Sequence, residues 1–196
     1  MSDDELKSAI GLMREARESA RGYADFFESN PSRDQEELGV VMALAKALDS
    51  AGELYFHQVR LRGRGDDPPD CEAVNMAGEK VAIEVTELVD GEAIRAVKSH
   101  PSAYVWADWS KDKFEKSLNH LVSRKDSRFP FLKGAPYNGG YTVLIFSDEP
   151  LLNKKTVSGY LKSISIAQPK NIDKVFLLLS YDAAIKNYPY FDISFS

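Results

Sequence analysis

The chain has 196 residues, of which 43% are hydrophobic and 28% charged, and its formal net charge is −5. These values are ordinary for a globular domain and exclude a low-complexity chain. No apolar run reaches the length of a membrane span, and the acidic N-terminus differs from a secretory signal. The single cysteine, Cys71, excludes an internal disulfide and fits a reducing compartment. We therefore expect a single domain over residues 1–196, cytoplasmic and not bound to a membrane.

The hydrophobic pattern predicts helices where apolar residues recur every three or four positions, and strands where runs are short and apolar or alternating. In chain order it predicts a helix over 4–29, a helix over 32–50, strands over 54–61, 70–75 and 80–88, a helix over 108–124, a strand over 141–146, a helix over 151–166, and strands over 174–179 and 190–195. The helix within residues 1–30 is an addition to a core over residues 33–196, and segment 91–106 has no clear prediction.

Segment Asp66–Asp90 carries the pattern that points most directly to a function. Two strand-like runs flank a polar turn over residues 76–79, so Asp70 falls opposite Glu84 in an antiparallel hairpin. Side chains at such positions are about 4.5–5.5 Å apart at their Cβ atoms. Two carboxylates this close repel, and one takes up a proton unless a cation lies between them. A divalent ion held by oxygen ligands removes this conflict, so the hairpin predicts a metal site.

At these residues the sequence resembles the PD-(D/E)xK phosphodiesterase superfamily, the restriction-endonuclease-like nucleases. The family motif is Pro-Asp, a spacer, an acidic residue, an apolar residue and lysine. Pro69-Asp70 matches the first half and Glu84-Val85 the second, whereas Thr86 stands where the family has lysine. The resemblance implies an α/β fold with a restriction-endonuclease-like core, in the order αβββαβ, built on a mixed central sheet flanked by helices.

The resemblance also implies a cofactor, Mg²⁺ or Mn²⁺, and its ligands. In the family the two acids and the carbonyl group after the glutamate bind the metal, which here means Asp70, Glu84 and the carbonyl of Val85. The metal polarises the phosphate and lowers the pKa of an attacking water.

Strand alternation separates Glu84 and Thr86 from Ile83 and Val85. Because the apolar set packs on helices, we expect Glu84 and Thr86 to face a cleft or solvent.

Family members commonly add a glutamate from the helix before the first core strand. Glu36 and Glu37 are both available, and we favour Glu37 because it borders the buried stripe of that helix, whereas Glu36 is expected to face water. The missing motif lysine leaves Thr86 or Lys125 to position the water or the phosphate. Lys125 has a second interpretation, as a cation that interacts favourably with the C-terminal end of its helix.

Charge is unevenly spread along the chain. Residues 95–140 hold nine basic and four acidic residues, a net +5, whereas residues 1–60 hold seven basic and twelve acidic residues, a net −5. A local positive field can neutralise phosphates even on an acidic protein. The alternative interpretation is an ordinary solvated helix face, and the sequence does not separate the two.

The resemblance and these residues together predict a metal-dependent phosphodiesterase, an endonuclease-like protein acting on DNA rather than RNA, and often working as a homodimer. The alternative is a descendant of the same fold that has lost catalysis and serves as a binding or regulatory module for a nucleic acid or a protein. The absence of the motif lysine favours the alternative, and the paired acids favour the enzyme.

Overall fold

The computed structural model describes residues 33–63, 65–91 and 108–196. The helix predicted over 4–29 and nearly all of segment 91–106 lie outside these residues. The elements, in chain order, are α2 (Arg33–Ala51), β1 (Phe56–Leu61), β2 (Cys71–Asn75), β3 (Lys80–Glu87), α4 (Lys111–Asp126), the 3₁₀ turn η2 (Phe129–Phe131), β4 (Tyr141–Ser147), α5 (Lys154–Leu161), β5 (Lys174–Leu179) and β6 (Tyr190–Asp192).

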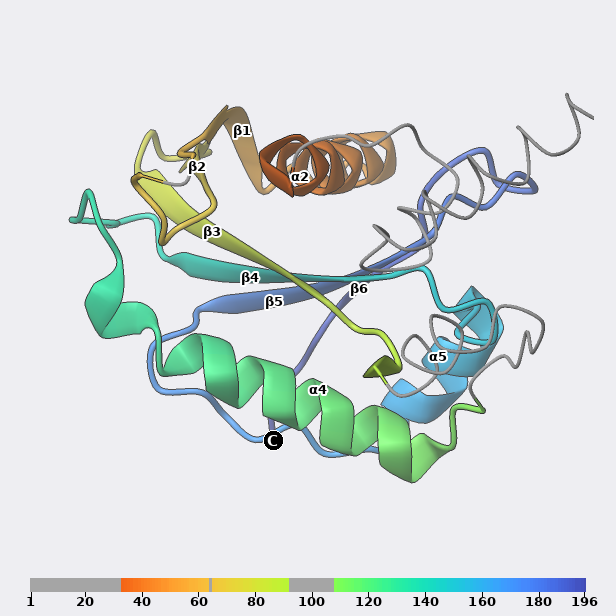
Figure 1. The fold of residues 1–196 in the computed structure, drawn as a ribbon. Helices are drawn as coiled ribbons and strands as arrows, with labels where there is room; N and C mark the ends of the chain where they lie inside the picture. The colour runs from red at the N-terminus through yellow and green to blue at the C-terminus, as the bar shows by residue number, and fades with distance from the viewer. Residues whose placement is uncertain (1–32, 64, 92–107) are drawn as a thin grey trace, which may run out of the picture.

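The six strands form one mixed sheet in the order β1-β2-β3-β4-β5-β6 (Figure 1). β1, β2 and β3 are antiparallel neighbours, β4 and β5 run parallel to β3, and β6 returns antiparallel at the far edge. The change from antiparallel to parallel pairing falls at β3, the strand that carries Glu84. The predicted mixed sheet with flanking helices is therefore confirmed, as is the edge strand near residue 190.

Helices cover both faces of the sheet (Figure 1). On one face, α2 packs on apolar residues from β1 to β5, including Phe56, Cys71 and Ile83. On the other face, α4 and α5 pack on a second cluster that includes Tyr141 and Val143. Cys71 is thus a fully buried core residue, and β3 lies between the two layers.

The expectation that Glu84 and Thr86 face a cleft or solvent is wrong for Glu84. The face of β3 that carries Glu84 packs beneath α4, and Glu84 has no exposed surface. Thr86, two residues along on that same face, is also buried but lines a cavity. The reason is that apolar residues of β4 and α4 enclose this face as well as the other, which the alternation within one strand does not reveal.

No helix within the described ranges 33–63, 65–91 and 108–196 is long and apolar enough to cross a membrane.

Candidate active site

The two acids of the hairpin lie side by side, as the sequence predicts. β2 and β3 pair Cys71 with Ile83, so the next position in register sets Asp70 opposite Glu84. Asp70 stands directly before β2, and its Oδ2 accepts the backbone N–H of Val85 at 2.7 Å. Both acids are almost fully buried. The hairpin thus brings two carboxylates together in a place where water cannot stabilise them.

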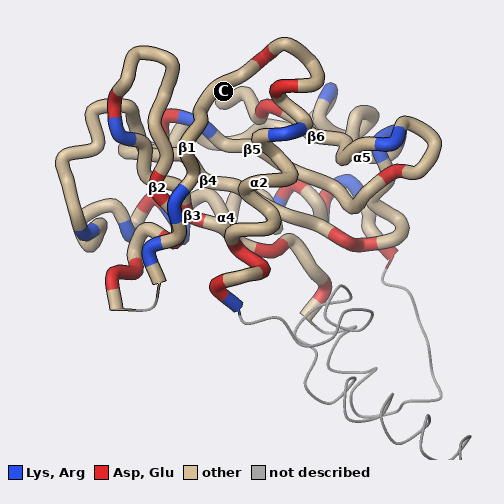
Figure 2. The backbone as a smooth tube through the Cα atoms, turned by 90° about the horizontal axis from the view of Figure 1, so that it is seen from above, with Lys and Arg blue, Asp and Glu red and all other residues tan. Residues whose placement is uncertain are grey.

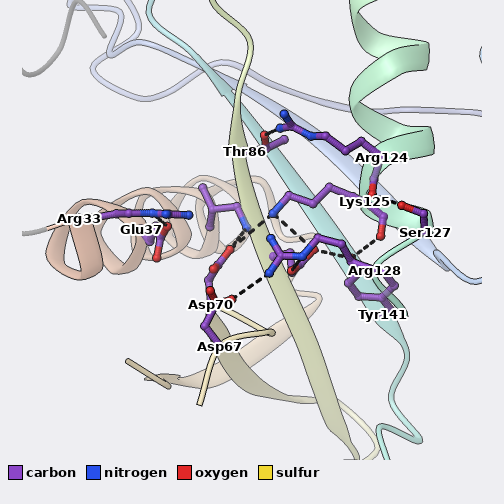
Figure 3. A network of polar contacts seen from close by, with 12 residues as sticks. Arg33, Glu37, Asp67, Asp70, Thr86, Arg124, Lys125, Ser127, Arg128 and Tyr141 are labelled. Carbon is purple, nitrogen blue, oxygen red and sulfur yellow. Dashed lines mark hydrogen bonds and ion pairs between the residues drawn. The ribbon is translucent and has the colours of Figure 1, made fainter. Parts of the chain in front are cut away.

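The cation between these carboxylates is an ammonium group from α4 (Figure 3). Lys125 Nζ lies 3.3 Å from Glu84 Oε2 and 3.8 Å from Asp70 Oδ2. Lys125 is only 3% exposed although it stands in the last turn of the helix. Both sequence interpretations of Lys125 therefore fit its position, because it stands near the C-terminal end of α4 and also reaches the two acids of the hairpin.

Two further residues complete the network around Glu84. The Tyr141 hydroxyl, from the first residue of β4, donates to Glu84 Oε2 at 2.6 Å and lies 3.0 Å from the carbonyl oxygen of Lys125. Arg128 Nε lies 3.1 Å from Glu84 Oε1, and its Nη2 lies 3.2 Å from Asp67 Oδ1. The contact with Oε1 is an ion pair without hydrogen-bond alignment, so this buried oxygen has no hydrogen-bond donor within residues 33–63, 65–91 and 108–196.

Burial and charge shift the proton affinities of this network. Burial raises the pKa of Asp70 to about 7, although the nearby Lys125 ammonium opposes the shift; the charges of Glu37 and Glu84 raise it further. Burial, with the neighbouring Glu84 carboxylate and its hydrogen bond, also raises the pKa of the Tyr141 hydroxyl. Tyr141 therefore remains a hydrogen-bond donor at any ordinary pH, and Asp70 can exchange a proton near neutrality.

A cavity of about 570 Å³ opens beside the network, between the start of α2, the end of β3 and the end of α4. Its lining residues are Arg33, Glu36, Glu37, Val40, Val85, Thr86, Glu87, Val89, Arg124, Lys125, Arg128 and Phe146. The basic members outnumber the acidic ones by four to three. The cavity therefore presents cations beside the two buried acids, and basic side chains of this kind are donors that a phosphate group can accept.

Two predicted residues reach this cavity by different contacts. Glu37, from α2, forms an ion pair with Arg33 at 2.6 Å and acts on Asp70 through its charge. Glu36, which we expected to face water, is half-buried and lines the same cavity. The Thr86 hydroxyl oxygen accepts a hydrogen bond from Nη2 of Arg124 at 2.9 Å. Thr86 thus orients an arginine at the position where the family has a lysine.

The donor set suits a divalent ion in part. The N–H groups of the even-numbered residues Ala82 and Leu88 point towards β4. Backbone N–H and carbonyl groups of successive residues in a strand point to opposite sides, so those of the odd-numbered Val85 point to the side of Asp70. Two carboxylates and one carbonyl are oxygen ligands of the kind that Mg²⁺ accepts together with water and phosphate. Glu84 Oε1, buried without a hydrogen-bond donor, is consistent with such a ligand. Within the described part of the chain, however, no three His, Cys, Asp or Glu residues group closely enough to hold a metal.

Sequence reasoning missed Tyr141, Arg124, Arg128 and Asp67 as members of the site. Tyr141 looked like the start of an apolar strand, but a hydroxyl at the end of a buried run needs a hydrogen-bond partner, and that was the available signal. The two arginines counted only as part of a basic segment. Their contacts show that the part of this segment around residues 124–128 lies against the acidic hairpin. Elsewhere, basic and acidic residues are interspersed over the described molecule in the view of Figure 2.

No family model matches the chain, and neither the curated proteins nor the solved structures include a match to it.

Proposed function

We propose that this protein is a metal-dependent phosphodiesterase of the PD-(D/E)xK type that cleaves DNA. The observation that carries the proposal is the meeting of Asp70, Glu84 and Lys125 beside a cavity lined by arginines. Two acids and one lysine are the charged groups of the family motif. Here the lysine comes from α4 instead of the strand that carries the glutamate. The element order of one helix, three strands, a helix and a strand supports the proposed restriction-endonuclease-like core.

In this proposal Asp70, Glu84 and the carbonyl of Val85 hold Mg²⁺ or Mn²⁺. A bound divalent ion supplies a Lewis acid for the phosphate and lowers the pKa of a bound water. Glu37 assists from α2 through its charge on Asp70. This set contains few protein ligands. Magnesium sites commonly have few, because substrate phosphates and water complete the coordination.

The remaining side chains act on the phosphodiester. Lys125 stabilises negative charge that develops on the phosphate, since its ammonium already lies within 4 Å of both acids. Arg124, held by the Thr86 hydroxyl, and Arg128 bind phosphate oxygens from the cavity wall. Arg128 has to leave Glu84 to do so, which its one-third exposed side chain permits.

The second candidate is a nuclease-like fold that binds a partner without turnover. One observation favours it: Lys125 already compensates the two acids, which are closed to solvent, so the network is complete as an internal ion-pair cluster. An enzyme keeps such acids for a metal, whereas a binding module keeps them only as part of its core.

Thermal unfolding with and without Mg²⁺ or Mn²⁺ separates the two candidates. A metal at roughly five times its Kd adds about 1 kcal/mol to the stability of the folded state, which raises Tm by roughly 2–4 °C. The enzyme hypothesis expects this rise in the wild type and in Glu79→Gln, a control in the turn of the same hairpin, but not in Glu84→Gln.

Cleavage of linear duplex DNA then tests catalysis in the same three proteins. Metal-dependent cleavage by the wild type and the control, lost in Glu84→Gln, supports the enzyme. Absence of both the thermal shift and cleavage in the wild type would leave only the binding module.

A further inference from the structure

A second cavity, of about 260 Å³, lies where the parallel strands β4 and β5 end and α5 begins. Its lining residues are Glu149, Pro150, Leu152, Asn153, Lys154, Leu179, Ser180, Tyr181, Asp182, Ala183 and Pro189. None of them lines the cavity of the candidate active site. The carboxyl ends of parallel strands are a common place for ligands in open α/β sheets, so this cavity is a second candidate ligand site.

Glu149 gives the cavity its chemical character. The side chain is only 4% exposed, and one oxygen, Oε1, accepts the backbone N–H of Asp90 at 2.6 Å. The other oxygen, Oε2, is buried and has no hydrogen-bond partner among the residues that the structure describes. A buried carboxylate oxygen without a donor is costly, and the cost is removed when a cationic donor approaches. Glu149, which lines the cavity, is thus held in place through one oxygen, while no donor in the described part of the chain compensates the other.

The charges around the cavity also favour a cation. Among the lining residues that the structure describes, Glu149 and Asp182 are acidic and Lys154 is basic, a net charge of −1. The Asp182 Oδ1 is already engaged by the N–H of Ala184 at 2.8 Å, which fixes the loop but leaves its charge in place. The volume lies below the roughly 300–1,000 Å³ of ordinary small-molecule pockets. It suits a single ammonium or guanidinium group with part of its stem.

The surroundings of the cavity indicate the source of that cation. Leu151, Tyr181 and Ile185 are exposed large hydrophobic residues in the two loops that frame it. Tyr181 is braced by an edge contact with Tyr188, with ring centroids 5.4 Å apart. A rigid aromatic ring can stack on a guanidinium group, and exposed apolar residues around a buried acid are typical of the place where a protein partner anchors an arginine.

We propose that this cavity binds a basic side chain, above all arginine, of a partner protein. Its guanidinium pairs with Oε2 of Glu149 and stacks on Tyr181, while apolar neighbours of that arginine cover Leu151 and Ile185. Arginine is favoured over lysine because its planar group can serve the carboxylate and the ring together. The proposal is independent of any nuclease activity, since it uses no residue of the candidate active site.

The test is an NMR titration of the full isotope-labelled chain with N-acetyl-arginine methylamide. We expect saturable changes at the amides of Ser180 and Tyr181, with a Kd in the millimolar range that suits a single side chain. The neutral isostere N-acetyl-citrulline methylamide should give no saturable change. Glu149→Gln, which keeps an acceptor for the Asp90 N–H, should weaken arginine binding at least tenfold, whereas Glu79→Gln should leave it unchanged.

A second variant keeps the proposal testable if Glu149→Gln does not fold. Lys154→Met removes an exposed cation, the only one among the described lining residues, so arginine binding should tighten roughly twofold. Equal binding of the arginine and citrulline probes, or no saturable change with either, would overturn the proposal. Tighter binding of spermidine than of the arginine probe would instead assign the cavity to a small polyamine.

Discussion

At the scale of single residues, Lys125 is the group on which the two buried acids depend. Removing one partner of a buried ion pair costs about 3–5 kcal/mol, because the remaining charges lose their compensation. Lys125→Met should therefore lower Tm by roughly 10 °C at pH 8. Circular dichroism melting would measure this effect. Lys116→Met is the matched control, since Lys116 lies on the exposed side of α4 and pairs with Asp112 in water; its Tm should be unchanged.

An unchanged Tm in Lys125→Met would mean that the acids are neutral in the folded protein without their lysine. The same variant should then show no difference between pH 5.5 and pH 8. If the ion-pair network is as the structure shows, the destabilisation should instead shrink at the lower pH, because Asp70 takes up a proton there.

The raised pKa of Asp70 makes a separate prediction about pH. The folded-state pKa, about 7, lies above the usual value of 3.8, so the folded protein holds a proton that the unfolded chain releases. This contribution to stability is fully present below the unfolded pKa and is lost as pH rises through about 7. Asp70→Asn is always neutral and keeps an acceptor for the Val85 N–H. Its Tm relative to the wild type should therefore rise between pH 5.5 and pH 8.5.

The control for this experiment is Asp192→Asn, at the exposed end of β6, for which the Tm difference should not vary over the same range. A Tm difference that stays constant with pH for Asp70→Asn as well would show that Asp70 is ionised throughout. Lys125 would then lower the pKa of Asp70 by more than burial raises it.

At the scale of elements, the junction before β4 allows this strand to lie beside β3. The N–H of Gly139 donates to the carbonyl of Lys80 at 2.9 Å, and a Cβ at Gly139 would come within 2.8 Å of the Glu79 carbonyl oxygen and 2.9 Å of the Lys80 one. Backbone atoms in a sheet cannot give way easily. Gly139→Ala should therefore destabilise the protein by roughly 1–3 kcal/mol.

Gly159, inside α5, provides the opposite case for the same substitution. A Cβ there would meet no atom within 4 Å, and alanine is the better helix former by about 1 kcal/mol. Gly159→Ala should raise the urea midpoint of unfolding while Gly139→Ala lowers it. A stabilised Gly139→Ala would show that β3 and β4 separate at this end more easily than the contacts indicate.

The buried strands β3 and β5 and the long helix α2 could be predicted from the sequence within one residue at each end, whereas the short helix α5 and the edge strand β6 could not. Residues 174–179 match β5, and 80–88 matches β3 within one residue, because buried runs bounded by turn residues define a strand locally. The helix predicted over 151–166 is in fact Lys154–Leu161. Asn153 caps its start through the Thr156 N–H. Beyond its end, contacts with a distant helix replace helical hydrogen bonds: Asn119 binds the carbonyl of Ser165. Such competition is tertiary and leaves no local pattern.

The candidate site divides in the same way. The register that sets Asp70 against Glu84 follows from the hairpin and its turn, so local sequence predicts it. The lysine, the tyrosine and the arginine that surround Glu84 arrive from α4, β4 and the turn after α4, at least 41 residues later in the chain. Their convergence depends on the packing of α4 across β3, and periodicity specifies which face of a helix is buried but not what it covers.

At the scale of the whole molecule, an acidic protein with a small basic cavity should bind DNA weakly and lose that binding in salt. The net charge is −5, and Arg124 and Arg128 are the cavity cations proposed to bind phosphate while Lys125 stays between the two acids, Arg128 after it leaves Glu84. Two phosphate contacts give a slope of about −1.8 in log K against log salt, so affinity for duplex DNA should fall about tenfold between roughly 50 and 200 mM salt.

Fluorescence anisotropy of labelled duplex DNA with the Glu84→Gln variant, which should not cleave it, measures this slope. Adding Arg128→Gln should reduce the slope by about 0.9, because one phosphate contact is lost. Adding Lys162→Gln, at the far end of α5, should leave it unchanged. An equal reduction by both substitutions would place the DNA outside the cavity, where any surface cation contributes alike. A steep slope that neither substitution changes would place it on another basic surface, and the arginines would then serve only to close the acidic site.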